Sequence, residues 1–227
     1  VLSNFTFDVH WSKEHEVTVQ QPAALLPWLH IGAMSDTWRW LQGELEELNI
    51  AAAIVLCKNH LDKSSIEEAK KLAEGKAARL VIVDAFDHPS YPIVRKDPGG
   101  PLEVALELVS WVRQRKQKLL INCWAGMNRA AAISAAVMME VENLTLLEAC
   151  EVLAAKRGRV LHNVSFRKQL LSLAVSLGLA GDLNAAASSP ARPEGTDQAD
   201  GEKAKPVAAA DDQDGEPFRK DDVDPTP

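Results

Sequence analysis

The chain has 227 residues, of which 46% are hydrophobic and 25% are charged, and this size fits one globular domain with flanking segments. The net charge is −7, but residues 190–227 hold 11 acidic and 5 basic residues, so the remainder is nearly neutral. Without a basic surplus, neither nucleic acid nor an anionic membrane is an expected partner. No run of about 18 apolar residues occurs, so no membrane span is predicted.

The cysteines are Cys57, Cys123 and Cys150, an odd number without the Cys-x-x-Cys spacing of zinc sites or a disulfide framework. This usage predicts a reducing compartment, the cytoplasm, with import into an organelle as an open alternative. No metal and no cofactor are expected.

Three regions differ in composition. Residues 1–24 form an N-terminal extension, in which alternating apolar and polar residues at 5–9 and 16–20 predict an edge hairpin. Residues 25–182 carry the pattern of a folded domain. Residues 183–227 are rich in Ala, Pro and Asp with almost no large apolar residue, which predicts a disordered acidic tail. This tail acts either as a docking segment for a partner or as a solubilising linker.

Strands and helices alternate along the predicted domain. Strands are predicted at residues 29–31, 51–56, 80–83 and 118–122, and helices at 35–48, 64–75, from 101, 129–141, 145–156 and 165–177. The second helix is expected to open with a capping box at Ser64 and Glu67, and the third at Pro101. Strands that are buried between helices predict an α/β fold with a central, mostly parallel sheet.

The strand at 118–122 runs directly into Cys123, and Arg129 follows at the start of a helix. A tight loop at a helix N-terminus turns its amides toward one point, where the helix dipole adds positive potential. A guanidinium at the end of such a loop binds two phosphate oxygens, and the same surroundings favour a thiolate. Gly126 lets the backbone pass close to an oxyanion. The pattern therefore predicts a phosphate-binding loop, Trp124, Ala125, Gly126, Met127 and Asn128, around a nucleophilic cysteine.

This segment resembles the HCxxGxxR signature of dual-specificity phosphatases, which belong to the protein-tyrosine-phosphatase superfamily. Further segments resemble family landmarks in the same order: residues 26–32 the entry motif, 48–56 the second strand, 81–84 the strand that ends in the general acid, and 161–170 the opening of the last helix. The resemblance covers residues 25–178. It implies a phosphocysteine mechanism and a phosphorylated protein (Ser, Thr or Tyr) as substrate.

The resemblance also implies roles for particular residues. Cys123 is the nucleophile, Arg129 the phosphate clamp and Asp84 the preferred general acid, with Asp87 as the alternative. Asn163 is a supporting residue. Cys57 occupies a position that resembles the cysteine that forms a reversible disulfide with the nucleophile, and the alternative is a small buried side chain.

Two residues depart from the signature. Asn122 stands where the family has His, and Ala130 where it has a Ser or Thr whose hydroxyl helps the sulfur to leave. These departures predict a slow phosphatase, or a phosphate-binding module that has lost efficient turnover.

The predicted loop has only one cationic clamp, because Trp124, Ala125, Met127 and Asn128 are uncharged. A phosphoprotein is therefore favoured over a multiply phosphorylated lipid, with RNA and glucan substrates as further alternatives. Trp124 lies either on the pocket floor or, as is commoner for Trp, in the core.

Overall fold

The computed structural model describes residues 22–181. The predicted hairpin at 5–20 and the predicted acidic tail lie outside these residues. The sheet has the order β1-β2-β5-β3-β4. Its strands are β1 (Ala23–Leu26), β2 (Leu29–Gly32), β3 (Ile50–Val55), β4 (Arg79–Ile82) and β5 (Lys118–Asn122). Only β1 and β2 pair antiparallel, and the other described pairs are parallel.

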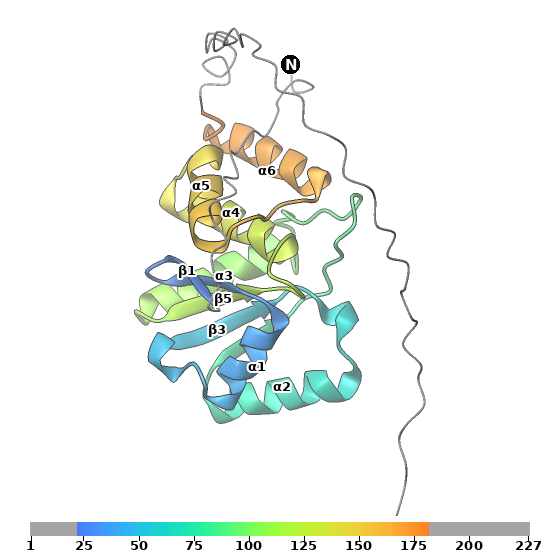
Figure 1. The fold of residues 1–227 in the computed structure, drawn as a ribbon, viewed down its shortest axis with the longest axis vertical. Coiled ribbons are helices and arrows are strands. Elements are labelled where there is room, and N and C mark those ends of the chain that lie inside the picture. Colours follow the sequence, from blue (N-terminus) through green and yellow to red (C-terminus); the bar gives the residue numbers. More distant parts are fainter. Residues whose placement is uncertain (1–21, 182–227) are drawn as a thin grey trace, which may run out of the picture. The chain divides into compact units, whose positions relative to one another are not determined.

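Helices cover both faces of this sheet (Figure 1). One face carries α1 (Met34–Gln42) and α2 (Lys63–Gly75). The other carries α3 (Pro101–Gln114), α4 (Arg129–Glu142), α5 (Leu146–Arg157) and α6 (Val164–Leu177). Short 3₁₀ turns, η2 (Glu46–Leu48) and η3 (Lys58–His60), precede and follow β3. The α/β fold with a mostly parallel sheet is thus confirmed.

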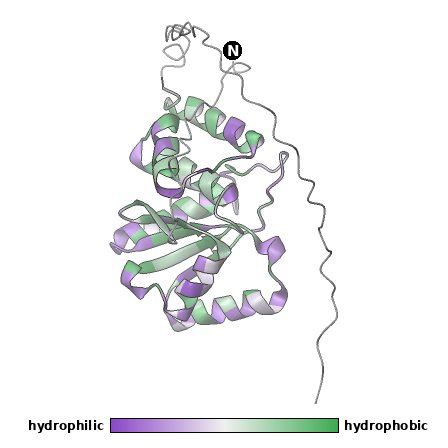
Figure 2. Cartoon of the chain, viewed as in Figure 1, coloured by the Kyte–Doolittle hydropathy of each residue, from purple (hydrophilic) through white to green (hydrophobic). Residues whose placement is uncertain are grey.

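Strand β3 lies between β5 and β4 and is buried on both faces. Ala52, Ile54 and Leu56 pack in the core under α3 to α6, whereas Ala53 and Val55 pack toward α1 and α2. Such alternation follows from the two-residue period of a strand. In Figure 2 the strands are green or pale, whereas α2 carries much purple on its outer side.

The sheet also contains a strand that the sequence pattern did not predict, β1, which begins within the expected N-terminal extension. The predicted helix at 35–48 is divided, because Gly43 adopts a left-handed φ of 89° and ends α1. The expected capping box at Ser64 and Glu67 is wrong. α2 begins earlier, with the Asp62 carboxylate accepting a hydrogen bond of 2.7 Å from the Ser65 amide.

The remaining boundaries lie close to those predicted. β5 and the start of α3 at Pro101 match, α4 and α6 differ by one residue at one end, and α5 is shifted by one residue. Because β2, β5 and β3 are parallel, their carboxyl ends meet at one edge of the sheet, and β5 delivers Cys123 there. No helix in the described part is long and apolar enough to cross a membrane.

Candidate active site

The segment between β5 and α4 folds into a loop whose carbonyl groups point outward. The Trp124 carbonyl accepts from the Met34 amide (3.2 Å), and the Met127 carbonyl accepts from the Leu161 amide (2.9 Å). The Ala125 carbonyl accepts from Arg157 Nη2 (2.9 Å). In contrast, no backbone N–H from Trp124 to Arg129 donates to another described residue. A loop that turns its carbonyls out and leaves consecutive amides unpaired is suited to bind an anion.

Gly126 is required at the tightest point of this loop. Its φ of 69° lies in the left-handed region. A Cβ at this position would lie 2.6 Å from both the Gly32 carbonyl oxygen and Arg157 Nη2, closer than non-bonded atoms approach. Glycine therefore allows the loop to pack directly on β2 and on the end of α5.

Arg129 begins α4 with a buried guanidinium. Nη1 donates to the Ala85 carbonyl at 3.0 Å and lies 3.5 Å from Asn59 Oδ1. Nε is buried without a hydrogen-bond partner among the described residues. Since a buried donor normally has an acceptor, this N–H is available to an anion in the loop.

Asn122 ties the start of the loop to α1. Its side-chain amide donates to the Ala33 carbonyl at 3.2 Å and to the Thr37 hydroxyl, while its buried Oδ1 has no described partner. The alternation of β5 explains this direction, because Leu120 and Asn122 point toward α1 whereas Cys123 belongs to the opposite core. Asn122 thus fixes the loop by hydrogen bonds without contributing a charge.

Two buried residues of opposite charge, Arg157 and Asp36, lie beside the loop. Burial lowers the pKa of Arg157, and the negative charges of Asp36 and Cys123 act in the opposite direction. Burial likewise raises the pKa of Asp36, against the hydrogen bond from the Ala33 amide and the positive charges of Arg157 and Arg39. Arg157 therefore supports the loop backbone and places a second positive charge near the Cys123 sulfur.

The structure brings Asp87, and not Asp84, into hydrogen bonding with the loop. Asp87 accepts 2.9 Å hydrogen bonds from the side-chain amides of Asn128 and Asn163. The Asn128 oxygen in turn accepts from the His162 amide at 2.7 Å. Asp84 is exposed, and its backbone carbonyl accepts from the Tyr91 hydroxyl.

The cysteines and Trp124 occupy different environments. Cys123 and Cys57 are buried at the carboxyl ends of neighbouring strands, and Cys57 Sγ lies 3.9 Å from Met34 Sδ. Burial, followed by the negative charge of Cys123, raises the pKa of Cys57 to about 11. Cys150 is buried in the core. Trp124 departs from the commoner expectation, because it is 55% exposed.

The sequence did not single out Arg157, Asp36 or Thr37. In the sequence they are indistinguishable from ordinary residues of the helices α5 and α1, and only the packing of these helices places them beside the loop. Asn59 was equally unmarked. No group of three or more His, Cys, Asp or Glu within residues 22–181 is arranged to hold a metal ion.

Residues 41–175 match the family model "Dual specificity phosphatase, catalytic domain". Among curated proteins, the chain is 26% identical over 157 residues to human dual specificity protein phosphatase 2, covering 66% of this chain and 42% of that protein. It is 27% identical over 175 residues to dual specificity protein phosphatase 1-A of Xenopus laevis, covering 74% and 41%. The chain thus spans about two fifths of the length of these relatives.

Solved structures share the fold. Human DUSP28 superposes with a TM-score of 0.55 at 17% identity, covering 69% of this chain and 95% of that structure. The human tyrosine phosphatase-like serine/threonine/tyrosine-interacting protein gives a TM-score of 0.55 at 20% identity, covering 68% and 96%. At these identities the likeness shows the architecture.

Proposed function

Because the chain belongs to the dual specificity phosphatase family, we propose that it hydrolyses phosphomonoesters on proteins, with Cys123 as the nucleophile. The observation that carries this proposal is that the loop amides after β5 and Arg129 Nε have no hydrogen-bond partner among the described residues. In this site the amides and Arg129 bind the phosphoryl oxygens. The α4 N-terminus and the charge of Arg157 add positive potential beside the Cys123 sulfur.

The reaction has two steps. The thiolate attacks phosphorus, the bond from phosphorus to the substrate oxygen breaks, and a carboxylic acid gives its proton to the departing oxygen. Water then attacks the phosphocysteine, the same carboxylate takes a proton from this water, and the sulfur leaves as a thiolate with release of inorganic phosphate. Neither step changes an oxidation state or requires a metal ion.

We assign the acid role to Asp87, in preference to Asp84. Asp87 is tied to the phosphate loop through Asn128 and to α6 through Asn163, so its carboxyl group is held near the position of a leaving oxygen. Asn163 therefore acts as a positioning residue for Asp87.

The second step is the slower one. Ala130 is buried in the first turn of α4, where its methyl group offers no hydrogen bond to the departing sulfur. Asn122 positions the loop without a charge. Both residues lower the rate relative to the signature residues, and they also support a second candidate, a phosphate-binding module with little turnover. One protein of the same fold is itself named a phosphatase-like interacting protein.

The two candidates are separated by metal-free incubation with p-nitrophenyl phosphate or a phosphopeptide beside a Cys123→Ser control. The enzyme releases p-nitrophenol or dephosphorylated peptide in a burst equal to the enzyme concentration, and inorganic phosphate follows at the slow rate of turnover; the control releases neither. Equal traces from both proteins would exclude cysteine-dependent catalysis and leave the binding module.

The acid assignment has its own test. Asp87→Asn should slow alkyl phosphoester cleavage much more than cleavage of p-nitrophenyl phosphate, because p-nitrophenolate departs without protonation. Asp84→Asn is the matched control. If Asp84→Asn alone shows this dependence on the leaving group, Asp84 is the acid.

A further inference from the structure

Apolar side chains are exposed around the mouth of the phosphate loop. Six large apolar residues are exposed among residues 22–181. Two of them, Trp124 and Met127, belong to this loop, and two more, Phe86 and Val164, are neighbours in sequence of residues that hydrogen-bond with Asn128 or Asp87. Phe86 precedes Asp87, while Val164 lines a pocket together with Asp87 and Asn128. We call these four side chains the rim. Exposed apolar side chains that gather at one place mark a binding surface.

Trp124 is the most firmly held member of the rim. Its indole stacks on the His60 imidazole, with ring centroids 5.1 Å apart and an interplanar angle of 27°. Its carbonyl accepts a hydrogen bond from the Met34 amide. His60 follows Asn59, which lies 3.5 Å from Arg129. The indole is therefore fixed relative to the phosphate clamp, although more than half of its surface is exposed.

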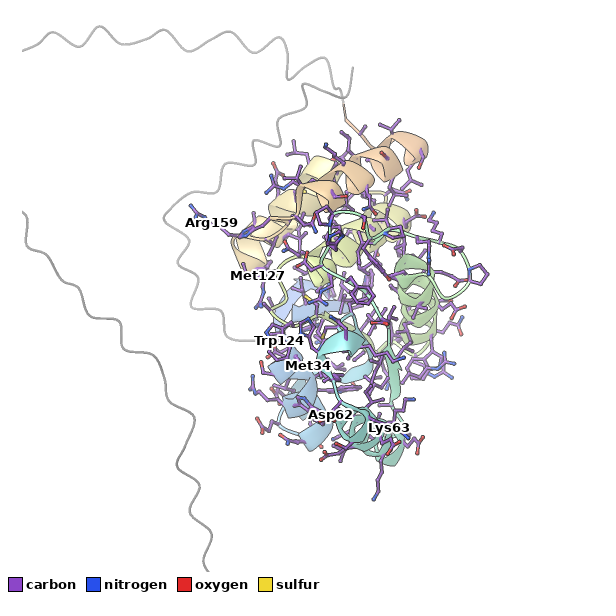
Figure 3. The ribbon with its side chains drawn as sticks, turned by 90° about the vertical axis from the view of Figure 1, so that its right-hand side faces the viewer. Met34, Asp62, Lys63, Trp124, Met127 and Arg159 are labelled. Carbon is purple, nitrogen blue, oxygen red and sulfur yellow. The ribbon has the colours of Figure 1, made fainter. Side chains whose placement is uncertain are left out.

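Figure 3 shows Trp124 and Met127 on the same side of the molecule, with Met34 next to Trp124. A rigid, exposed indole offers a large contact area at a low cost in side-chain entropy. Because Trp124 directly follows Cys123, a group that packs on this indole is attached close to the phosphorylated atom.

The pocket beside the loop indicates what kind of molecule carries that group. Its volume is about 780 Å³, and its lining includes His162, Asn163, Ser165 and Lys168. Hydrogen-bonding side chains of this kind suit the N–H and C=O groups of a peptide main chain, whereas acyl chains would leave them unpaired. The surroundings of the site therefore favour a peptide over a lipid.

The geometry points to a specificity subsite, which rests on the proposed phosphatase site: Trp124, held by His60, binds an aromatic or large aliphatic side chain next to the phosphorylated residue of a peptide. Packing of a ring on the indole is worth about a fivefold gain in affinity. Substrates with an aromatic or large aliphatic neighbour are thus preferred over those with alanine or an acidic residue at that place.

The test measures binding of labelled phosphopeptides to Cys123→Ser protein by fluorescence anisotropy. Two peptides of equal charge carry phenylalanine or alanine on both sides of the phosphorylated residue, and their unphosphorylated forms are the reference. We expect the phenylalanine peptide to bind about five times more tightly. Adding Trp124→Ala should abolish this ratio, and Trp124→Phe should keep part of it. Leu147→Ala, which removes an exposed apolar side chain of α5, should leave it unchanged.

The outcomes separate this inference from the proposed function. If both phosphopeptides bind better than their unphosphorylated forms but equally to each other, the subsite is refuted and the phosphate site stands. If phosphorylation makes no difference, the phosphate site itself fails. Persistence of the ratio in Trp124→Ala would also refute the subsite. Trp124-dependent binding to phosphatidylcholine vesicles containing a phosphoinositide, without a peptide preference, would overturn the assignment to peptides.

Discussion

Substitution of Gly126 by alanine tests whether the phosphate loop packs as tightly as its geometry implies. A Cβ at Gly126 would meet the Gly32 carbonyl oxygen and Arg157 Nη2, both at 2.6 Å. The neighbour on β2 is backbone, which cannot turn aside as a flexible side chain does. The loop or the strand must therefore move to accept the methyl group.

The cost has two parts. A left-handed φ costs alanine about 1–2 kcal/mol, and crowding against a packed neighbour costs about 1–3 kcal/mol more. Gly178, which follows α6, separates the two, because its φ of 72° and ψ of 19° are also left-handed but a Cβ there would have no atom within 4 Å. Gly178→Ala should therefore lower the free energy of unfolding by about 1–2 kcal/mol, and Gly126→Ala by about 2–5 kcal/mol.

Urea denaturation measures these differences, and phosphatase assays measure their effect on the site. A displacement of the loop by about 1 Å costs roughly a hundredfold in rate, so we expect kcat/KM to fall by this order in Gly126→Ala and to change little in Gly178→Ala. Equal losses of stability and activity in the two variants would refute the close approach of the loop to β2 and Arg157.

Three further predictions concern other residues. Ala130→Ser should speed hydrolysis of the phosphocysteine, which replaces a burst with steady release in rapid-quench assays; an unchanged burst would contradict the role given to the missing hydroxyl. Peroxide should oxidise Cys123 to a sulfenic acid, which Cys57 converts to a disulfide with loss of water. Formation of the disulfide should become faster as the pH rises from 7 to 9, because burial raises the pKa of Cys57 to about 11 and its thiolate fraction therefore grows over this range. Peptide mapping that finds Cys57 always reduced would remove this reaction. Burial and the charge of Lys118 lower the pKa of His30 to about 4. The unfolded chain therefore binds this proton first, and stability falls from about pH 6.5 toward pH 4, by about 2 kcal/mol at pH 5. Urea denaturation at several pH values should find that the free energy of unfolding depends less on pH in His30→Asn than in the parent protein.

The fold was largely predictable because its elements follow simple periods. β5 is a short apolar run that ends in a polar residue, and α3 opens with Pro101 at its first position, so both could be located from local chemistry. The spacing of apolar residues predicted one helix from residue 35 to residue 48. The structure ends α1 at Gln42, because Gly43 adopts the left-handed conformation of a C-cap.

The site was predictable only in part. The spacing of Cys123 and Arg129 on a strand, loop and helix carries its own chemical meaning, whereas the last-turn position of Arg157 on α5 is typical of a solvated cation. Asp84 and Asp87 lie in one loop, and which carboxyl group reaches Asn128 depends on the path of that loop. The exposure of Trp124 likewise depends on His60, which approaches it from another segment.

The most direct measurement is the identification of the residue that carries phosphate during turnover. The protein is mixed with a phosphopeptide without metal, quenched in acid at early times and analysed by peptide mass spectrometry. A cysteine-dependent phosphatase accumulates one phosphoryl group on the peptide that contains Cys123, in the parent protein and not in Cys123→Ser. Phosphate release without this adduct, or with the phosphoryl group on another residue, would contradict the account.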